Sequence, residues 1–155
     1  MSAAALIALC RAKNLRLATA ESCTGGLIAA ALTDPPGASA VFTHGFVTYA
    51  NAAKTSMLGV PEPLLAAHGA VSAEIAAAMA AGAQALSDAD LAIATTGIAG
   101  PDGGSPDKPA GTVWFGLASR DTVTTYHRLF PGNRDDVRRA SVAFALALLQ
   151  GGAEA

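Results

Sequence analysis

Apolar and polar positions along the chain change between a helix-like period and a strand-like period. The amphipathic run after Ser2 predicts a helix that ends near Lys13, and a short β-type run, Leu15–Thr19, follows it. The apolar run Leu27–Leu32 predicts a second helix, which ends at Asp34–Gly37 because that segment holds two prolines. The first third therefore predicts a helix, a strand and a second helix.

The middle of the chain predicts one strand and three helices. β-Forming residues indicate a strand over Val41–Tyr49. Two short helices are expected next, one capped by Asn51 and one over Glu62–His68, and Ser72 caps a longer helix. The face of the longer helix that we expect to be buried holds three large apolar residues: Ile75, Met79 and Leu86.

The last third predicts three strands and one helix. The apolar run Leu91–Thr95 indicates a buried strand, and Gly111–Ala118 with Val123–Phe130 indicates a hairpin. Asn133 caps a last helix, which is expected to end at the glycine pair 151–152. This order predicts the α/β class: a three-layer α/β/α domain with a mixed central sheet, in one domain over residues 1–155.

Composition narrows the classes of protein to consider. The length of 155 residues suits one domain. Hydrophobic residues make up 52 % of the chain and charged residues only 14 %, a composition that excludes a disordered chain. A formal net charge of −2 argues against non-specific binding to nucleic acid, and no apolar run approaches the ~20 residues of a membrane span. Cys10 and Cys23 lie in different predicted elements and do not indicate a disulfide scaffold, so a cytoplasmic location is expected.

The turn Thr19–Gly26 carries the densest set of reactive groups, between a predicted strand and a predicted helix. Ser22 is a candidate nucleophile, and Lys54 is a candidate base if burial or a nearby cation lowers its pKa. The alternative is that Ser22 only caps the helix and that Lys54 is solvated. Cys23 is a competing nucleophile, because a helix N-terminus can lower the pKa of a thiol; its other reading is a small buried packing residue.

Other groups in this turn can contact a ligand. The backbone N–H groups of Thr24, Gly25 and Gly26 can bind an oxyanion or a phosphate. Glu21 either orients Lys54 or a ligand, or lies in a surface turn.

Two further segments suggest anion binding. The loop that begins at Thr96 contains Gly97 and Gly100 and is long enough to be functional, but it matches neither a dinucleotide fingerprint nor a P-loop. Arg134 and Arg138 lie one turn apart at the start of the last helix, where they can clamp a phosphate or carboxylate, or pair with neighbouring aspartates on a solvated face. The three histidines lack the spacing of metal ligands, so no metal is expected.

Five ordered segments, spread from about residue 3 to residue 150, together resemble one family. They are Ala20–Gly26; Gly45–Tyr49 with Asn51 and Lys54; His68–Ser72; Thr96–Pro101 with Gly103 and Gly104; and Lys108–Trp114. The chain resembles the CinA C-terminal domain family (competence/damage-inducible protein), whose enzymatic members are nicotinamide-nucleotide amidohydrolases. Larger members carry an N-terminal domain as well, and this chain is expected to be the stand-alone form.

The resemblance implies hydrolysis of nicotinamide mononucleotide to nicotinate mononucleotide and ammonia, in pyridine nucleotide salvage, without metal or other cofactor. It assigns Ser22 as nucleophile and Lys54 as base, and Arg134 matches the arginine of the family's Gly-Asp-Arg pattern. The residues expected to bind substrate are Glu21, Thr24, Gly25, Gly26, Tyr49, Asn51, Thr96, Gly97, Gly100 and Arg138. A homo-oligomer with a small nucleotide substrate is expected, and the alternative is a non-catalytic nucleotide-binding or interaction module of the same fold.

The chain departs from the family pattern at three positions. His44 stands where arginine is expected before Gly45, Ala50 where serine is common, and Asn133 where aspartate usually precedes Arg134. None of the three removes the proposed nucleophile or base.

Overall fold

The computed structural model describes residues 2–155, and it folds them around one five-stranded sheet. The strand order is β2-β1-β3-β4-β5, with β1 parallel to β2 and β3, and β4 antiparallel to β3 and β5. The strands are β1 (Leu17–Glu21), β2 (Phe42–Val47), β3 (Leu91–Gly97), β4 (Thr112–Ser119) and β5 (Thr122–Leu129). The predicted mixed sheet of an α/β protein is thus confirmed.

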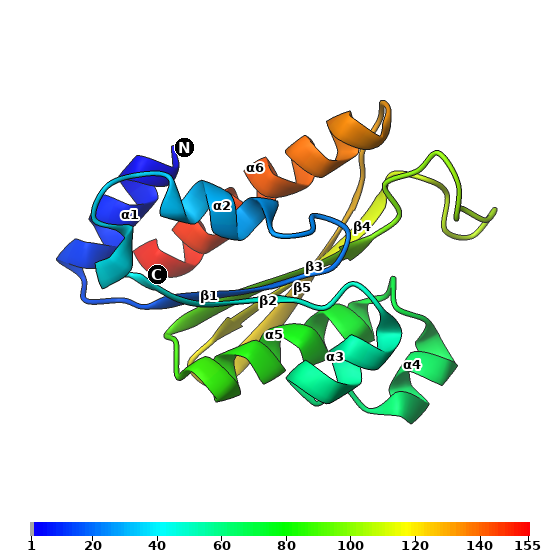
Figure 1. Ribbon diagram of the computed structural model, residues 1–155, viewed down its shortest axis with the longest axis horizontal. Helices are drawn as coiled ribbons and strands as arrows, with labels where there is room; N and C mark the ends of the chain where they lie inside the picture. The colour runs from blue at the N-terminus through cyan, green and yellow to red at the C-terminus, as the bar shows by residue number, and fades with distance from the viewer. Residues whose placement is uncertain (1) are drawn as a thin grey trace.

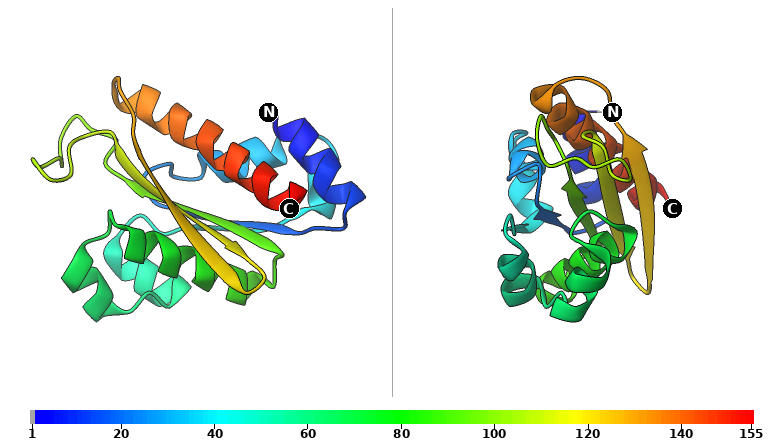
Figure 2. Two further views of the ribbon diagram at one scale, coloured as in Figure 1. Left: turned by 180° about the vertical axis from the view of Figure 1, so that it is seen from behind. Right: turned by 90° about the vertical axis from the view of Figure 1, so that its right-hand side faces the viewer.

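Helices cover both faces of this sheet, which gives the three layers that the sequence predicts (Figure 1). In Figure 1, α1, α2 and α6 lie above the sheet and α3, α4 and α5 lie below it. The helices are α1 (Ala3–Ala12), α2 (Leu27–Thr33), α3 (Asn51–Leu58), α4 (Glu62–His68), α5 (Ala73–Ser87) and α6 (Arg134–Glu154), with a 3₁₀ turn η1 (Ala38–Ala40) before β2. The view from behind in Figure 2 (left) shows the same layering, with the loop between β3 and β4 extending beyond the sheet.

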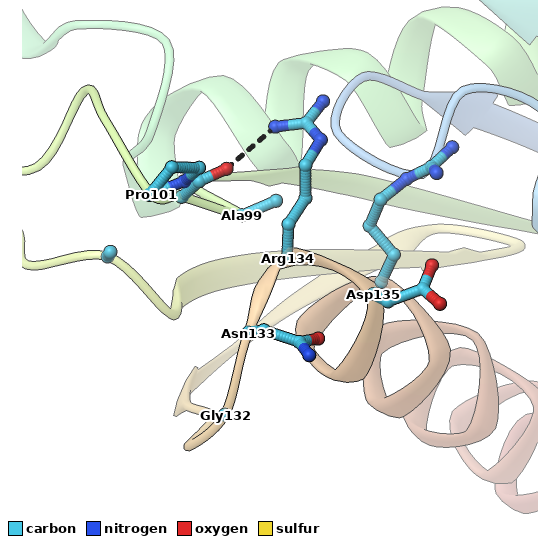
Figure 3. A pocket seen from close by; sticks show the side chains of 9 residues that line it. Ala99, Pro101, Gly132, Asn133, Arg134 and Asp135 are labelled. Atoms are coloured by element: carbon cyan, nitrogen blue, oxygen red, sulfur yellow. Dashed lines mark hydrogen bonds between the residues drawn. The ribbon is translucent and has the colours of Figure 1, made fainter.

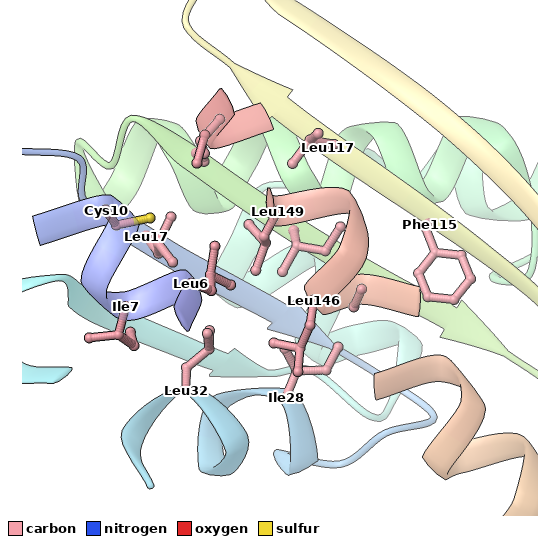
Figure 4. Close-up of a cluster of buried hydrophobic side chains, with 14 of the residues drawn as sticks. Leu6, Ile7, Cys10, Leu17, Ile28, Leu32, Phe115, Leu117, Leu146 and Leu149 are labelled. Atoms are coloured by element: carbon pink, nitrogen blue, oxygen red, sulfur yellow. The ribbon is translucent and has the colours of Figure 1, made fainter. Parts of the chain in front are cut away.

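A separate apolar core fills each side of the sheet. The larger core packs α1, α2 and α6 on the sheet and includes Phe115 of β4, and Figure 4 shows many of its side chains. The second core lies beneath α5 and is rich in alanine, including Ala80, Ala83, Ala92 and Ala94. Small side chains let α5 approach the strands closely, which fixes the lower layer against the sheet.

The parallel register places three chain segments at one edge of the sheet. Glu21, the last residue of β1, pairs with Val47 of β2 and with Thr95 of β3. The residues that follow, beginning with Ser22 and Thr48, therefore leave the sheet side by side. Ligands of such sheets bind beyond the carboxyl ends of the parallel strands.

Several predicted strand boundaries shift. β1 ends at Glu21 rather than Thr19, and β3 ends at Gly97 rather than Thr95. β1 begins at Leu17 rather than Leu15, because the Leu15 N–H donates to the Cys10 carbonyl and completes the end of α1. β2 ends at Val47 rather than Tyr49, since the chain turns there toward α3.

Two predicted helix ends are wrong. Ala50, not Asn51, is the N-cap of α3, and it makes no side-chain capping bond. α6 continues through Gly151 and Gly152 to Glu154. Gly152 faces Leu91 and Leu117 of the sheet, so the missing Cβ allows close helix packing there instead of ending the helix.

The buried face of α5 also differs from the prediction. Leu86 is 58 % exposed, whereas Ile75 and Met79 are buried as expected. The buried stripe is completed by alanines, so a pattern based on large apolar residues misplaces its end.

Candidate active site

Ser22 lies in a tight turn directly after β1. Its backbone N–H donates to the Thr95 carbonyl at 3.0 Å, and its carbonyl accepts from the Gly25 N–H at 3.0 Å. Gly25 and Gly26 have φ angles of 56° and 104°, which favour glycine over other residues. The sequence thus folds this turn so that the serine hydroxyl is held at the end of a buried strand.

Lys54 extends from α3 toward this serine. Its Nζ lies 3.0 Å from Ser22 Oγ, and the side chain is 1 % exposed. Nζ also donates to the Thr48 carbonyl at 2.8 Å and to the Tyr49 carbonyl at 3.1 Å. The solvated reading of Lys54 is therefore wrong, and the two predicted reactive groups are in hydrogen-bonding contact.

Burial lowers the pKa of Lys54, because removing an ammonium ion from water disfavours its charged form. Within residues 2–155, no carboxylate forms an ion pair with this amine to offset that effect. A neutral amine has two N–H groups and one lone pair. The Thr48 and Tyr49 carbonyls accept the two N–H groups, which leaves the lone pair for the Ser22 hydroxyl proton.

Cys23 is a poorer nucleophile than its position suggests. Burial raises the pKa of the Cys23 thiol to about 11. The thiol therefore remains protonated near neutral pH, and the thiolate is the reactive form. The geometry favours Ser22 over Cys23 as the attacking group.

Glu21 caps α2 and does not line the cavity beside Ser22. Its two carboxylate oxygens accept from the Ile28 N–H at 2.9 Å and from the Ala29 N–H at 3.1 Å, and the side chain is 0 % exposed. The carboxylate thus stabilises the helix N-terminus rather than facing Lys54 or a ligand. Ser22 makes no capping bond to α2, whose N-cap is Gly26, so its hydroxyl is available for chemistry.

A cavity of about 270 Å³ adjoins the Ser22–Lys54 pair. It brings together eight of the residues predicted for the site: Ser22, Tyr49, Asn51, Lys54, Thr96, Gly97, Gly100 and Arg134. Five others do not line it: Glu21, Thr24, Gly25, Gly26 and Arg138. The cavity therefore lies where three parts of the chain meet: the ends of the parallel strands, the glycine-containing loop that begins at Thr96, and the start of α6.

Several lining residues were not predicted for the site. They are Ala70, Val71, Ile98, Ala99, Asp102 and Gly103, whereas Cys23, the competing nucleophile, also lines the cavity. The Thr96 hydroxyl donates to the Ala70 carbonyl at 2.8 Å, which ties the segment before α5 to the cavity. The segment His68–Ser72, already singled out for its resemblance to the family, was the available signal for Ala70 and Val71.

Arg134 lines both this cavity and a larger neighbour of about 510 Å³, whose lining residues Figure 3 shows. Its Nη1 donates to the Gly100 carbonyl at 2.9 Å, and its Nη2 donates to Tyr49 Oη at 3.1 Å. In Figure 3 the Arg134 side chain extends from the start of α6 toward the loop that carries Pro101, whereas Asn133 points away from that loop. The larger cavity also contacts Arg138 and Asp135.

Arg138 contacts the nucleophile turn itself. Its Nε donates to the Cys23 carbonyl at 3.2 Å and its Nη2 to the Thr24 carbonyl at 3.4 Å. The alternative, in which Arg134 or Arg138 pairs with a neighbouring aspartate, is wrong: Asp135 forms an exposed ion pair with Arg139 instead, at 2.6 Å. Arg134 and Arg138 are therefore free of that pairing.

The three departures from the family pattern lie outside the reacting atoms. His44 is exposed on β2 and stacks on Phe46, with ring centroids 6.2 Å apart. Ala50 is the N-cap of α3, and its side chain has no polar group that could cap the helix. Asn133 caps α6 by accepting from the Asp136 N–H at 2.9 Å, as predicted.

The described part of the chain holds neither a metal-binding cluster nor a membrane-spanning helix. Residues 2–155 contain no group of three or more His, Cys, Asp or Glu side chains placed to hold a metal ion. None of the helices in those residues is long and apolar enough to cross a membrane.

Comparison with known proteins gives consistent matches. A family model described as "CinA C-terminal domain" matches residues 1–152. A Pseudomonas putida protein named "Nicotinamide-nucleotide amidohydrolase PncC" is 55 % identical over 142 residues, which cover 91 % of this chain and 89 % of that protein. A "CinA-like protein" from Geobacter sulfurreducens is 55 % identical over 146 residues, but this chain, covered to 94 %, spans only 35 % of its length.

Solved structures agree with the sequence matches. The crystal structure of the competence/damage inducible protein CihA from Agrobacterium tumefaciens superposes with a TM-score of 0.93 at 46 % identity. The match covers 96 % of this chain and 92 % of that one.

Proposed function

The chain belongs to the CinA C-terminal domain family, and from that premise we propose that it is a serine–lysine amidohydrolase that converts nicotinamide mononucleotide to nicotinate mononucleotide and ammonia. The Pseudomonas relative with the amidohydrolase name matches over most of both chains, which supports this class of reaction and substrate. The longer CinA-like relatives are matched over only about a third of their length, so the whole-protein properties of those relatives are not carried over.

The observation that carries the proposal is the contact between Lys54 and Ser22. An amide is a poor electrophile, so its hydrolysis needs an activated nucleophile and a proton donor for the leaving amine. Lys54 supplies both functions, because its pKa is lowered by burial and its Nζ lies 3.0 Å from Ser22 Oγ. A lysine with a pKa in its ordinary range would be protonated and unable to accept the hydroxyl proton near neutral pH.

Acylation proceeds in balanced steps. Ser22 Oγ attacks the carboxamide carbon while its proton passes to Lys54 Nζ, and the carbonyl oxygen becomes an oxyanion. The intermediate collapses when the C–N bond breaks and Lys54 returns the proton to the leaving NH₂ group, which departs as ammonia. The product of this half-reaction is an ester between Ser22 and the nicotinate moiety.

Deacylation repeats the chemistry with water. Lys54 accepts a proton from a water molecule that attacks the ester carbonyl, and it returns that proton to Ser22 Oγ when the ester bond breaks. The free carboxylic acid ionises and leaves. Among the residues that follow Ser22 in the turn, Cys23 lines the cavity, and its backbone N–H stabilises the oxyanion in both halves.

The nucleotide can be placed along the two connected cavities. With the carboxamide at Ser22, the ring lies in the smaller cavity beside Thr96 and Tyr49, and the ribose phosphate reaches Arg134 at the boundary with the larger one. Arg134 already has two of its N–H groups directed to Gly100 and Tyr49, so the guanidinium is held in place with donors left for phosphate oxygens.

The test is ammonia release from nicotinamide mononucleotide by the wild type and by Ser22→Ala and Lys54→Ala. We expect release by the wild type and a loss of at least ~10³-fold in kcat in both variants, because neither group alone completes the proton transfers. Ser56→Ala, an exposed change on the same helix as Lys54, is the matched control and keeps full activity.

Two outcomes would contradict the proposal. Release that survives Ser22→Ala in folded protein would remove the nucleophile assignment. Binding of the nucleotide without release by the wild type would favour the non-catalytic nucleotide-binding module instead.

A further inference from the structure

The loop between β3 and β4 forms one wall of the cavity beside Ser22. Five residues of the loop line that cavity: Ile98, Ala99, Gly100, Asp102 and Gly103. Residues 101–107 are all exposed, and Figure 2 (left) shows the loop extending beyond the sheet. A hydrophobic core therefore does not hold this part of the loop, and the position of the wall depends on individual hydrogen bonds.

The connection between α4 and α5 forms another part of the wall. Ala70 and Val71 of that connection line the same cavity. Lys108, near the end of the loop, reaches this connection: its Nζ donates to the His68 carbonyl at 2.9 Å and lies 3.4 Å from a Cβ built on Gly69. Lys108 thus joins two segments that line the cavity, although its own side chain does not line it.

The acceptor of this hydrogen bond lies at a helix end. His68 is the last residue of α4, and the carbonyls in the last turn of a helix lack partners within the helix. A cationic donor is favourable at that end, because the helix dipole is negative there. Within residues 2–155, the His68 carbonyl accepts no other hydrogen bond, so Lys108 supplies its partner.

The loop is held from both helical layers. The Lys108 N–H donates to Ser105 Oγ at 3.1 Å and its carbonyl accepts from the Ser105 N–H at 2.9 Å, which fixes Lys108 to the exposed part of the loop. Nearer the start of the loop, Arg134 Nη1 donates to the Gly100 carbonyl. In the described chain, these contacts of Lys108 with α4 and of Arg134 with α6 are the side-chain hydrogen bonds that join residues 98–108 to the helices.

We propose that Lys108 is a positioning residue that holds this loop against the end of α4 and thereby sets the shape of the substrate cavity, an inference that rests on the proposed amidohydrolase function. The effect on substrate passes through Gly100, because its carbonyl fixes Arg134, the proposed phosphate contact. A loop that is already in its binding position does not have to be ordered when the substrate binds. Lys108 should therefore act on substrate binding and leave the proton transfers between Ser22 and Lys54 unchanged.

The experiment compares ammonia release by Lys108→Met, Lys108→Arg and Lys13→Met. Lys13 is the matched control: its Nζ also donates to a carbonyl near a helix end, that of Ala153, but it lies beside Leu91, at the opposite end of β3 from the site. We expect Lys108→Met to raise KM about 3- to 10-fold with kcat changed less than about twofold, the effect of one hydrogen bond net of water. Lys108→Arg keeps a cationic donor and should recover most of the wild-type KM, and Lys13→Met should leave both constants unchanged.

A second measurement needs no substrate. Backbone order parameters from NMR report the mobility of the loop on the picosecond-to-nanosecond timescale. In Lys108→Met the values for residues 102–105 should fall toward the range below about 0.6 that marks flexible backbone, and in Lys13→Met they should match the wild type. Thermal unfolding checks that each variant is folded, and Lys108→Ala takes the place of Lys108→Met if the latter is not.

Several results would overturn the inference. Unchanged order parameters in Lys108→Met would show that the loop keeps its position without this hydrogen bond, and a mobile loop with unchanged KM would show that the bond does not shape the cavity. A fall in kcat at constant KM would assign the effect of Lys108 to the reacting groups instead. An equal rise of KM in Lys13→Met would trace the effect to general stability.

A wild type that releases no ammonia would overturn the inference together with the proposed function on which it rests. The order parameters distinguish the two failures. If the loop still becomes mobile in Lys108→Met, the hydrogen bond holds the loop as described, and the error lies in the proposed substrate or reaction.

Discussion

Lys54 combines deep burial with uncharged neighbours, and this combination decides the chemistry of the site. A lysine at the surface remains an ammonium ion, and a buried lysine beside a carboxylate is held in that form. Lys54 contacts two backbone carbonyls and one hydroxyl, which accommodate a neutral amine without an unpaired donor. The direction of its pKa shift follows from burial alone, and Arg134 is not needed to explain it.

The pH dependence of catalysis should report this residue. Only the neutral amine accepts the Ser22 proton, so kcat/KM rises with pH along a limb whose midpoint is the pKa of Lys54 in the free enzyme. Because burial lowers that pKa, the midpoint lies below the ordinary lysine value of about 10.4. A pH–rate profile of ammonia release measures it.

The same shift predicts how folding stability depends on pH. The unfolded chain binds a proton at Lys54 more readily than the folded chain, so the contribution of this residue to the free energy of unfolding increases as pH rises between the two pKa values. Urea unfolding at several pH values, with Lys54→Met as the control that lacks this dependence, measures it. A midpoint for catalysis at the ordinary lysine pKa, or an equal pH dependence of stability in the control, would contradict the assignment.

At the scale of elements, α5 lies unusually close to the sheet. A Cβ built on Gly116 of β4 would collide with the Ala76 carbonyl of α5, and one on Gly82 of α5 would collide with the Leu58 carbonyl of α3. Glycine at these two places is required by space rather than by backbone conformation. The lower layer, which carries Lys54 on α3, is therefore positioned by contacts that tolerate no added methyl group.

Gly116→Ala should destabilise the protein, because α5 must move away from the sheet or β4 must deform. We expect a loss of about 1–3 kcal/mol in the free energy of unfolding, as for other overpacked cores. Gly151→Ala is the matched control: nothing lies within 4 Å of its built Cβ, and alanine favours the helix by about 0.5–1 kcal/mol. Urea denaturation compares the two variants, and equal stability of both would show that α5 is not held at close contact.

Local signals predicted the elements well, and tertiary contacts explain the errors. Ser2, Ser72 and Asn133 are N-caps as predicted, because a cap depends on the residues within one turn of it. The end of α6 was wrong because Gly152 packs on the sheet and Lys13 Nζ donates to the Ala153 carbonyl near the helix end, at 2.6 Å. Both contacts join residues that are far apart in the sequence, so the residues around the helix end do not predict them.

The sequence predicted the reactive residues of the candidate site, but not the backbone groups to which its side chains form hydrogen bonds. Ser22 and Lys54 were singled out from the turn and the resemblance, yet their 3.0 Å separation depends on how α3 returns to the sheet. Glu21 and Arg138 were expected to contact substrate. In the structure the Glu21 carboxylate accepts hydrogen bonds from backbone N–H groups of α2, and the Arg138 guanidinium donates to backbone carbonyls of the turn after Ser22. Backbone N–H and C=O groups are the same in every residue, so sequence patterns do not reveal which ones a side chain will find.

At the scale of the whole molecule, the site forms where the two helical layers, one on each face of the sheet, meet the ends of the strands. Ser22 follows β1, Lys54 comes from α3 below the sheet, and Arg134 comes from α6 above it (Figure 1). The cavity joins residues more than 100 positions apart, so neither half of the chain can form it alone. The expected homo-oligomer and cytoplasmic location stay predictions.

Because the site spans both layers, a bound nucleotide should stabilise the folded molecule as a unit. Ser22→Ala retains the proposed binding groups but does not consume the ligand, so it is the suitable protein for this measurement. Nicotinamide mononucleotide at 100 times its Kd adds about 2.7 kcal/mol to the free energy of unfolding, which corresponds to a rise in Tm of about 5–10 °C for a chain of this length.

The phosphate contribution can be isolated with two matched comparisons by differential scanning fluorimetry. Nicotinamide riboside, which lacks the phosphate, should raise the Tm of Ser22→Ala much less than the mononucleotide does at the same concentration. Adding Arg134→Ala should remove most of this difference between the two ligands, because Arg134 is the proposed phosphate contact at the boundary of the two cavities. If the mononucleotide keeps its full advantage over the riboside in the double variant, the phosphate binds elsewhere, and the placement of the nucleotide along the two cavities must be reversed.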